Sequence, residues 1–222
     1  MLFDLFKYGL SLQTFVNLAT RIFIIFAILP FHEFAHALIA TKLGDNTAKM
    51  NGRLTLNPLA HIDPIGALMI FVAGFGYAKP VPVNPFNFKD KKKGMALTAL
   101  AGPVSNIVLA FISIFFMYFF RIFLKGTLGE VVALFLYYNA ILNTNLAVFN
   151  FLPIPPLDGS RLIAVVLPDK IYFKLAMYER YIIIVVFVLL LMGLLTAPLV
   201  FMSSGLIRLM ERSMSFIFSF GK

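Results

Sequence analysis

Four long apolar stretches limit the folds that are open to this chain. They cover about residues 22–43, 95–120, 131–152 and 181–202, and each has or approaches the roughly 20 residues that a helix needs to cross a bilayer. With 60% hydrophobic and 13% charged residues, a water-soluble globule could not cover its surface with polar side chains. We therefore expect an all-α membrane protein, a polytopic helical bundle with about four full transmembrane helices.

A fifth apolar run, residues 65–78, has only 14 residues and three glycines. It suits a re-entrant or half-buried segment better than a full crossing. Before it, prolines exclude a regular helix, and the sequence RLTL at residues 53–56 predicts a short β-like stretch. Nothing in the composition marks a second domain, so we expect one intramembrane domain over residues 1–222, with its core at about 22–165.

The net charge of +9 comes from Lys and Arg in short loops between the apolar runs. This distribution is typical of loops that face anionic lipid on the cytoplasmic side, and it does not call for a nucleic-acid partner. Arg21 and Lys42 are expected to bracket the first span and reach its two surfaces. Since the chain has no Cys, a metal would be held by His, carboxylate or carbonyl groups.

The sequence HEFAH, residues 32–36, places three ionisable groups inside the first apolar stretch. On a helix, His32 and His36 share one face and can bind one zinc ion, and Glu33 beside them can act as general base. One alternative is a pair of core histidines with Glu33 in a proton path. A metal or proton transporter that uses the same cluster is the alternative to a zinc enzyme with Glu33 as its base.

A catalytic zinc site with two histidines needs a third protein ligand. Asp158 is the best candidate because three prolines break the helix before it, and irregular backbone at membrane depth lines a cavity or is buried in protein. Asp158 could instead cap a helix that begins at Ser160. His61 and Asp63 are rival ligands.

The membrane topology relates HEFAH to the stretch that carries Asp158. If residues 65–78 are re-entrant, Asp158 reaches the same membrane face as the histidines, and that face holds twelve Lys and Arg residues against seven. Full crossing would separate the motifs and give eleven against eight. The positive-inside rule then makes the shared face cytoplasmic.

Several further polar residues are candidates for a water path to the metal: Asn57, His61, Asn106 and Asn150. For each Asn, packing between helices is an equally good interpretation. The stretch at residues 53–56 could pair with an extended substrate or form only a local hairpin.

Five motifs in order resemble the site-2 protease family of intramembrane zinc metalloproteases, in its short form without a PDZ domain. They are HEFAH (32–36), GRLTLNPLAHIDPIG (52–66), GYAKPVPVNP (76–85), AGPVSN (101–106) and NFLPIPPLDG (150–159). The resemblance implies one catalytic Zn²⁺ held by His32, His36 and Asp158, with Glu33 as base.

The same resemblance makes Asn150 a substrate- or oxyanion-binding residue. It also implies an enzyme that cleaves transmembrane segments of other membrane proteins within the lipid bilayer. We expect it in the plasma membrane of a prokaryote, with its active site toward the cytoplasm.

Overall fold

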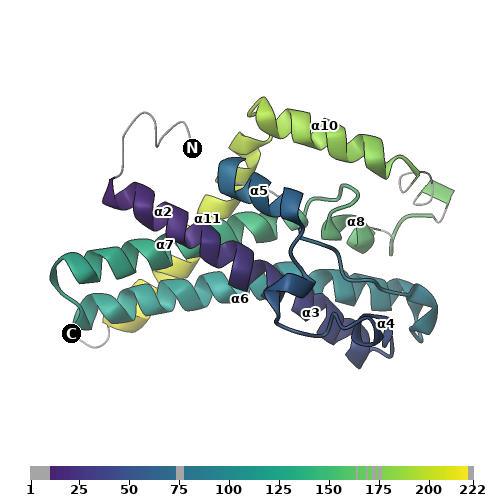
Figure 1. Cartoon of the computed structure of the whole chain (residues 1–222), viewed down its shortest axis with the longest axis horizontal. Helices are drawn as coiled ribbons and strands as arrows, with labels where there is room; N and C mark the ends of the chain where they lie inside the picture. Colours follow the sequence, from purple (N-terminus) through teal and green to yellow (C-terminus); the bar gives the residue numbers. More distant parts are fainter. Residues whose placement is uncertain are drawn as a thin grey trace.

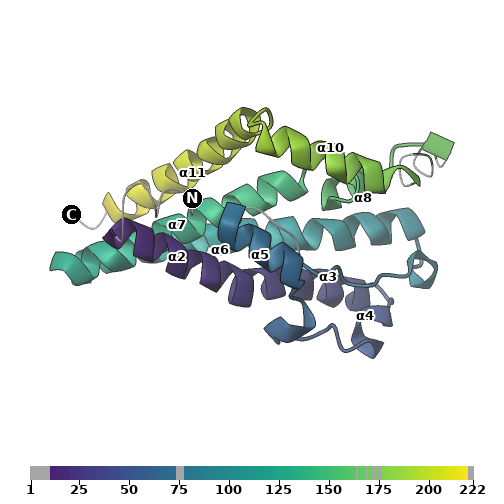
Figure 2. The ribbon, with the colours of Figure 1, turned by 45° about the horizontal axis from the view of Figure 1, so that its top comes forward.

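A computed structural model describes residues 11–73, 78–163, 165–168, 170–171, 174 and 177–219. These residues are all-helical, as predicted (Figures 1 and 2). The elements in chain order are α2 (Leu12–Phe23), η1 (Ile24–Ile28), α3 (Leu29–Lys42), α4 (Thr47–Met50), η2 (Pro58–Ala60), α5 (Pro64–Ala73), η3 (Pro85–Asn87), α6 (Lys91–Phe123), α7 (Gly126–Asn150), α8 (Asp158–Ile163), α10 (Glu179–Leu191) and α11 (Thr196–Ser219).

The first long helix consists of α2, η1 and α3 in one continuous stretch, Leu12–Lys42, which begins ten residues before the predicted span. Its middle segment, η1, is a π-helix in which the Leu29 N–H donates to the Ile24 carbonyl. Pro30 follows directly and has no N–H to donate. The helix is therefore wider just before the HEFAH motif, and such local π-helical turns are frequent at functional sites.

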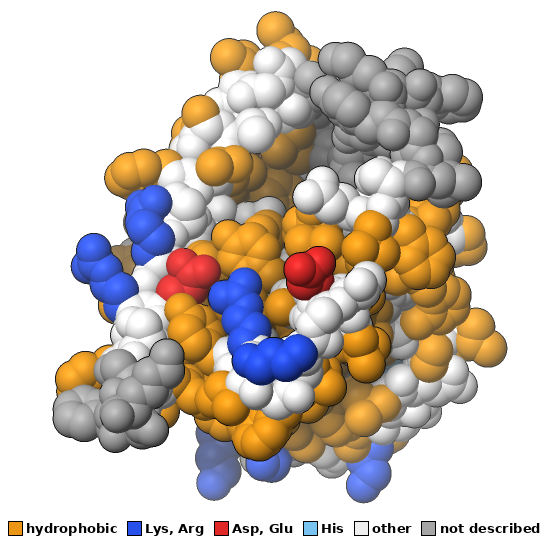
Figure 3. Space-filling model, turned by 90° about the vertical axis from the view of Figure 1, so that its left-hand side faces the viewer, with side chains coloured by type: hydrophobic (Ala, Val, Ile, Leu, Met, Phe, Trp, Pro, Cys, Tyr) orange, Lys and Arg blue, Asp and Glu red, His pale blue; other side chains and the backbone are white. Residues whose placement is uncertain are grey.

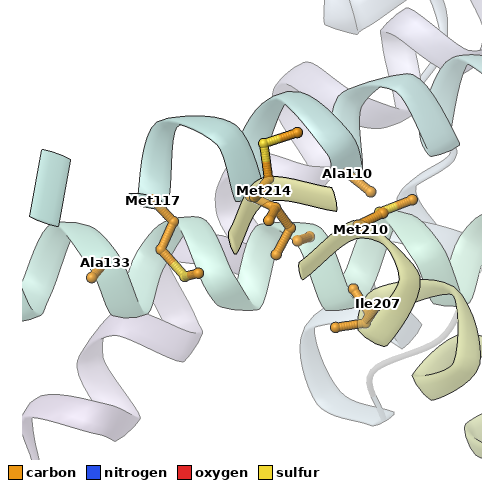
Figure 4. Packing of buried hydrophobic residues seen from close by; sticks show 8 residues of the cluster. Ala110, Met117, Ala133, Ile207, Met210 and Met214 are labelled. Atoms are coloured by element: carbon orange, nitrogen blue, oxygen red, sulfur yellow. The ribbon is translucent and has the colours of Figure 1, made fainter. Parts of the chain in front are cut away.

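Helices α6 and α7 form a long antiparallel hairpin that crosses the first helix (Figures 1 and 2). Small and flexible apolar side chains fill the hairpin, and three residues of α11 pack onto them (Figure 4). The buried cluster comprises Ala110, Ile114, Met117, Ala133, Ala140, Ile207, Met210 and Met214. This packing places α11 against the hairpin.

Three helical segments in the described residues are long and apolar enough to cross a membrane: Leu12–Lys42, Lys91–Phe123 and Gly126–Asn150. Large apolar side chains remain exposed, such as Phe15 at 61% and Phe201 at 75%. Hydrophobic side chains are also spread widely over the face shown in Figure 3. Only a lipid environment can cover so much apolar surface, so the chain is an integral membrane protein.

The predicted fourth span, residues 181–202, is not one helix. Helix α10 ends after 13 residues, and α11 begins at Thr196. At the break, the N–H of Gly193 donates to the Leu190 carbonyl and the N–H of Leu194 to the Leu189 carbonyl. This is the Schellman pattern, and Gly193 adopts the positive φ of 75° that it requires. The prediction followed hydropathy alone and missed this stop signal.

The predicted β-like stretch at residues 53–56 was also wrong, because the described residues contain no strand. Two backbone groups that could pair with a neighbouring strand have other hydrogen-bond partners. The Arg53 N–H donates to the Ala48 carbonyl, and the Thr55 carbonyl accepts from the His61 ring. The segment is a compact loop that carries the Arg53 side chain inward, where it is 7% exposed.

Arg21 does not reach a membrane surface as predicted. It lies on α2 and is buried within the protein, at 4% exposure. Its guanidinium donates to the carbonyls of Ile70 and Phe71, near the end of α5. These hydrogen bonds tie the first helix to α5. Helix α5 spans ten residues, about 15 Å. The predicted run 65–78 also includes residues 74–77, which lie outside the described residues.

Candidate metal centre

The structure brings His32, His36 and Asp158 together from positions more than 120 residues apart in sequence. The Nε2 atoms of the two histidines lie 3.1 Å apart. The Asp158 Oδ2 atom lies 3.3 Å from His32 Nε2 and 3.2 Å from His36 Nε2. Both histidines are buried, at 5% and 4% exposure. Three potential ligand atoms thus form a nearly equilateral triangle inside the protein.

The size of this triangle suits a small tetrahedral ion. Bonds of about 2.0–2.1 Å at tetrahedral angles place neighbouring ligand atoms about 3.3–3.4 Å apart. The observed separations of 3.1–3.3 Å are close to that edge length. Two imidazoles and one carboxylate also match the donor set of a catalytic zinc site with an open fourth position.

Helix α6 orients the histidines through Thr98 and Gly102. The Nδ1 atom of His36 lies 2.7 Å from the Thr98 carbonyl oxygen, so Nδ1 donates and Nε2 stays free as a ligand. One turn later, a Cβ on Gly102 would lie under 3.0 Å from Nε2 of both histidines. The sequence reasoning missed Thr98, whose contribution is a backbone carbonyl that residue identity does not reveal.

We predict that Gly102→Ala lowers zinc affinity by at least about tenfold, since overpacking a rigid site typically costs 1–3 kcal/mol. The added methyl group must displace imidazole rings or separate α3 from α6. Chelator competition on the purified protein measures the affinity. Gly205→Ala in α11 is the matched control, because a Cβ there meets nothing within 4 Å. Equal zinc affinity for both variants would contradict the close approach of Gly102.

Asp158 is the first residue of α8, and its carboxylate is directed at the histidines. Burial raises the pKa of the Asp158 carboxyl, but His36 and His32 outweigh it and hold this pKa well below its usual range. The next residue, Gly159, packs against the end of α7, where a Cβ would lie under 3.0 Å from the carbonyl oxygens of Phe151 and Leu152. This contact fixes where α8 begins.

The two rival ligands have other partners. Asp63 Oδ1 accepts from the backbone N–H groups of Ile65 and Gly66, so this carboxylate caps α5. His61 is fully buried, and its Nε2 atom lies 2.8 Å from the Thr55 carbonyl oxygen. Neither residue joins the group of closely spaced ligand atoms.

Glu33 is held by the segment that follows α5. Its Oε2 atom accepts from the Val81 backbone N–H at 3.1 Å, and the side chain is 8% exposed. Arg53 fixes the same segment, because its guanidinium donates to the carbonyls of Lys79 and Pro80. The Arg53 charge also acts on Glu33 through space. A loop far from HEFAH in sequence therefore sets the orientation of this carboxylate.

Asp45 anchors the other end of that segment to the end of α3. Its carboxylate accepts from the Asn84 backbone N–H and the Asn87 side chain, each at 2.7 Å, and from Thr47. Burial raises the pKa of Asp45, but these hydrogen bonds outweigh it and hold the pKa below its ordinary value. Asp45 is thus a buried anion that ties the loop to the HEFAH helix.

A cavity of about 340 Å³ opens beside the centre. Glu33, Asp158 and both histidines line it, together with Asn150 from the last turn of α7. The Asn150 amide donates to the Leu146 carbonyl of its own helix. Of the four polar residues predicted to line a water path, Asn150 alone belongs to this cavity wall in the described structure; Asn57 caps η2.

Comparisons with known proteins assign the chain to a family. The sequence pattern of peptidase family M50 matches residues 122–194, a stretch that includes Asp158. The protein named "Putative zinc metalloprotease YwhC" of Bacillus subtilis is 45% identical over 166 residues, 71% of this chain and 74% of its own length. The chain belongs to peptidase family M50, the site-2 protease family.

Two relatives with lower identity carry the same kind of name, "Putative zinc metalloprotease". Rip2 of Mycobacterium tuberculosis is 33% identical over 59% of this chain and 51% of its own length. MJ0611 of Methanocaldococcus jannaschii is 31% identical over 60% of this chain and 63% of its own length. This chain therefore spans about half of the mycobacterial protein. No solved structure matches it.

Proposed function

We propose that this protein is a zinc endopeptidase that cleaves transmembrane segments of other membrane proteins. The observation that carries the proposal is the triangle of His32, His36 and Asp158, whose two histidines lie with Glu33 on a helix able to span the bilayer. The relatives' names support zinc as the metal. Neither the comparisons nor the site geometry favours the transporter alternative.

His32, His36 and Asp158 would hold the single zinc ion. When bound, zinc supplies Lewis acidity, which acidifies water and polarises a carbonyl group. Glu33 accepts the proton of the attacking water and then passes it to the leaving amine. The hydrogen bond from Val81 limits the rotation of this carboxylate, which lines the same cavity as the triangle.

Asn150 is proposed to bind the substrate backbone or the oxyanion that develops during attack. It lies on the cavity wall between the end of α7 and the loop that leads to Asp158. A side-chain amide offers donors to an oxyanion and an acceptor to a peptide N–H. Its bond to Leu146 uses one of the two donor hydrogens, which leaves the other available.

The end of the molecule that carries α4 is proposed to face the cytoplasm of a prokaryotic cell. Helix α3 ends and α6 begins at this same end (Figure 1), and the basic cluster at residues 89–93 lies there. The chain between the end of α3 and the start of α6 must then return to the membrane face from which it started. We accordingly propose that α5 is part of a re-entrant segment in the plasma membrane.

A reconstituted assay tests this function. The full chain is placed in lipid vesicles with a single-span substrate, and a second substrate carries a Gly-Pro pair near the cleaved bond. A helix hides its peptide groups in hydrogen bonds, so we expect faster cleavage of the substrate with the helix-breaking pair, and no cleavage of either after zinc is chelated. Equal rates would contradict substrate unwinding, and cleavage without zinc would contradict the metal mechanism.

A further inference from the structure

Several buried polar side-chain atoms have no hydrogen-bond partner within the part of the chain that the structure describes. Among the described residues, these include His32 Nδ1, both polar side-chain atoms of Asn106, and Asn143 Oδ1. Asn106 and Asn143 are fully buried. Leaving such atoms unpaired is costly, and most buried polar groups in proteins pair with protein or ordered water.

His32 and Asn106 belong to one region because α6 packs along α3. Thr98 contacts His36 through its carbonyl, and Gly102 packs against both histidine rings. Residues four apart on a helix share a face, so Asn106 occupies the next position on this face, past Gly102 and toward the N-terminal side of His32. The order along α6 is a carbonyl for His36, a glycine against both rings, and then a buried amide.

Asn143 lies at the same level of the α6–α7 hairpin as Asn106. Helix α6 ends at Phe123 and α7 begins at Gly126, so Asn106 and Asn143 are equally far from the turn, and an antiparallel hairpin brings such residues to the same level. Apolar neighbours close the region. Leu109 and Leu142 pack against a buried cluster that includes Ile28 and Leu29, in the turn before His32.

The asymmetry between the two histidines is informative. A metal-binding histidine almost always donates its second ring N–H to a carboxylate, a carbonyl or water, which fixes the tautomer and the ring orientation. His36 has the Thr98 carbonyl for this role, whereas His32 Nδ1 has no protein partner among the described residues.

We propose that Asn106 is the positioning residue for His32 and acts through one buried water molecule. The water accepts the Nδ1–H of His32 and is held by the Asn106 amide and by Asn143 Oδ1, which supplies the three partners that a buried water typically has. His32 Nε2 is then left as an acceptor that faces His36 and Asp158. The inference rests on the proposed zinc role of the histidines.

The test compares Asn106→Leu and Asn106→Asp in the purified full chain. Leucine removes the polar atoms at similar volume, and aspartate keeps an acceptor. We expect Asn106→Leu to lower zinc affinity by about 10–100-fold, the usual cost of losing an outer partner, and to shift the visible absorption bands of the cobalt-substituted protein. Asn106→Asp should stay within about threefold of wild type in zinc affinity, because the acceptor is retained.

Thr144→Val is the matched control, because Thr144 is equally buried but bonds only to the Ala140 carbonyl of its own helix. It should leave zinc affinity and the cobalt spectrum unchanged. The proposal is overturned if Asn106→Leu keeps both wild-type properties, or if Asn106→Asp binds zinc as weakly as Asn106→Leu. If Asn106→Leu does not fold, the comparison of Asn106→Asp with wild type decides. Wild-type protein that binds no zinc would instead overturn the proposed function itself.

Discussion

Changing Glu33 to Gln should lower kcat/KM for a transmembrane substrate by about 1,000-fold, within the range that a general base contributes. Zinc should remain bound at one ion per chain, because Glu33 is not one of the three converging residues. Gln keeps the size of the side chain and can still accept from Val81, but it cannot take a proton from water. Vesicle cleavage rates and metal analysis of the same preparation measure both quantities.

The matched control for this change is Glu130→Gln, which makes the same chemical substitution on an exposed residue near the start of α7. It should leave both cleavage and zinc unchanged. A Glu33→Gln variant that cleaves at the wild-type rate would exclude Glu33 as the base. Loss of zinc from that variant would instead mean that Glu33 helps to hold the metal.

Changing Asp158 to Ala should weaken zinc binding by more than about 100-fold, because losing a ligand costs more than losing an outer partner. Its Oδ2 atom forms one corner of the triangle, and without it two imidazoles remain. Cleavage should be lost in parallel. Dialysis against a graded chelator series followed by metal analysis measures the affinity.

Asp63→Ala is the informative comparison, because Asp63 was a rival ligand in the sequence. It should lose about 1 kcal/mol of stability through its helix cap and keep its zinc, since its carboxylate accepts from the start of α5. Zinc loss on changing Asp63, with zinc retained on changing Asp158, would exchange the roles of the two residues.

Features of the fold could be predicted from the sequence where they depend only on residues that are close together along the chain. The spacing of His32 and His36 requires only a helix, and hydropathy identifies the three segments able to span a bilayer. Asp158 could be singled out because prolines interrupt the helix before it. The break at Gly193 was also local, but a long apolar run concealed it.

Other features depend on residues that meet only after folding. Arg21 looked like a surface anchor, yet the carbonyls of α5 pack over it. Arg53 looked like part of a strand, yet it holds the segment that fixes Glu33. In both cases a long cationic side chain donates to backbone carbonyls of a segment that is distant in sequence, and hydropathy does not record where those carbonyls will lie.

By itself, the sequence determined that the chain forms apolar helices for a membrane, and that one of them carries two imidazoles and a carboxylate, because periodicity and composition act over a few turns. Only the tertiary structure decided that Asp158, and not His61 or Asp63, completes the triangle. It also decided that the Thr98 carbonyl and Gly102 shape the histidine pair. The physical reason is that these contacts join α3, α6 and α8, and their distances exist only once those helices have packed.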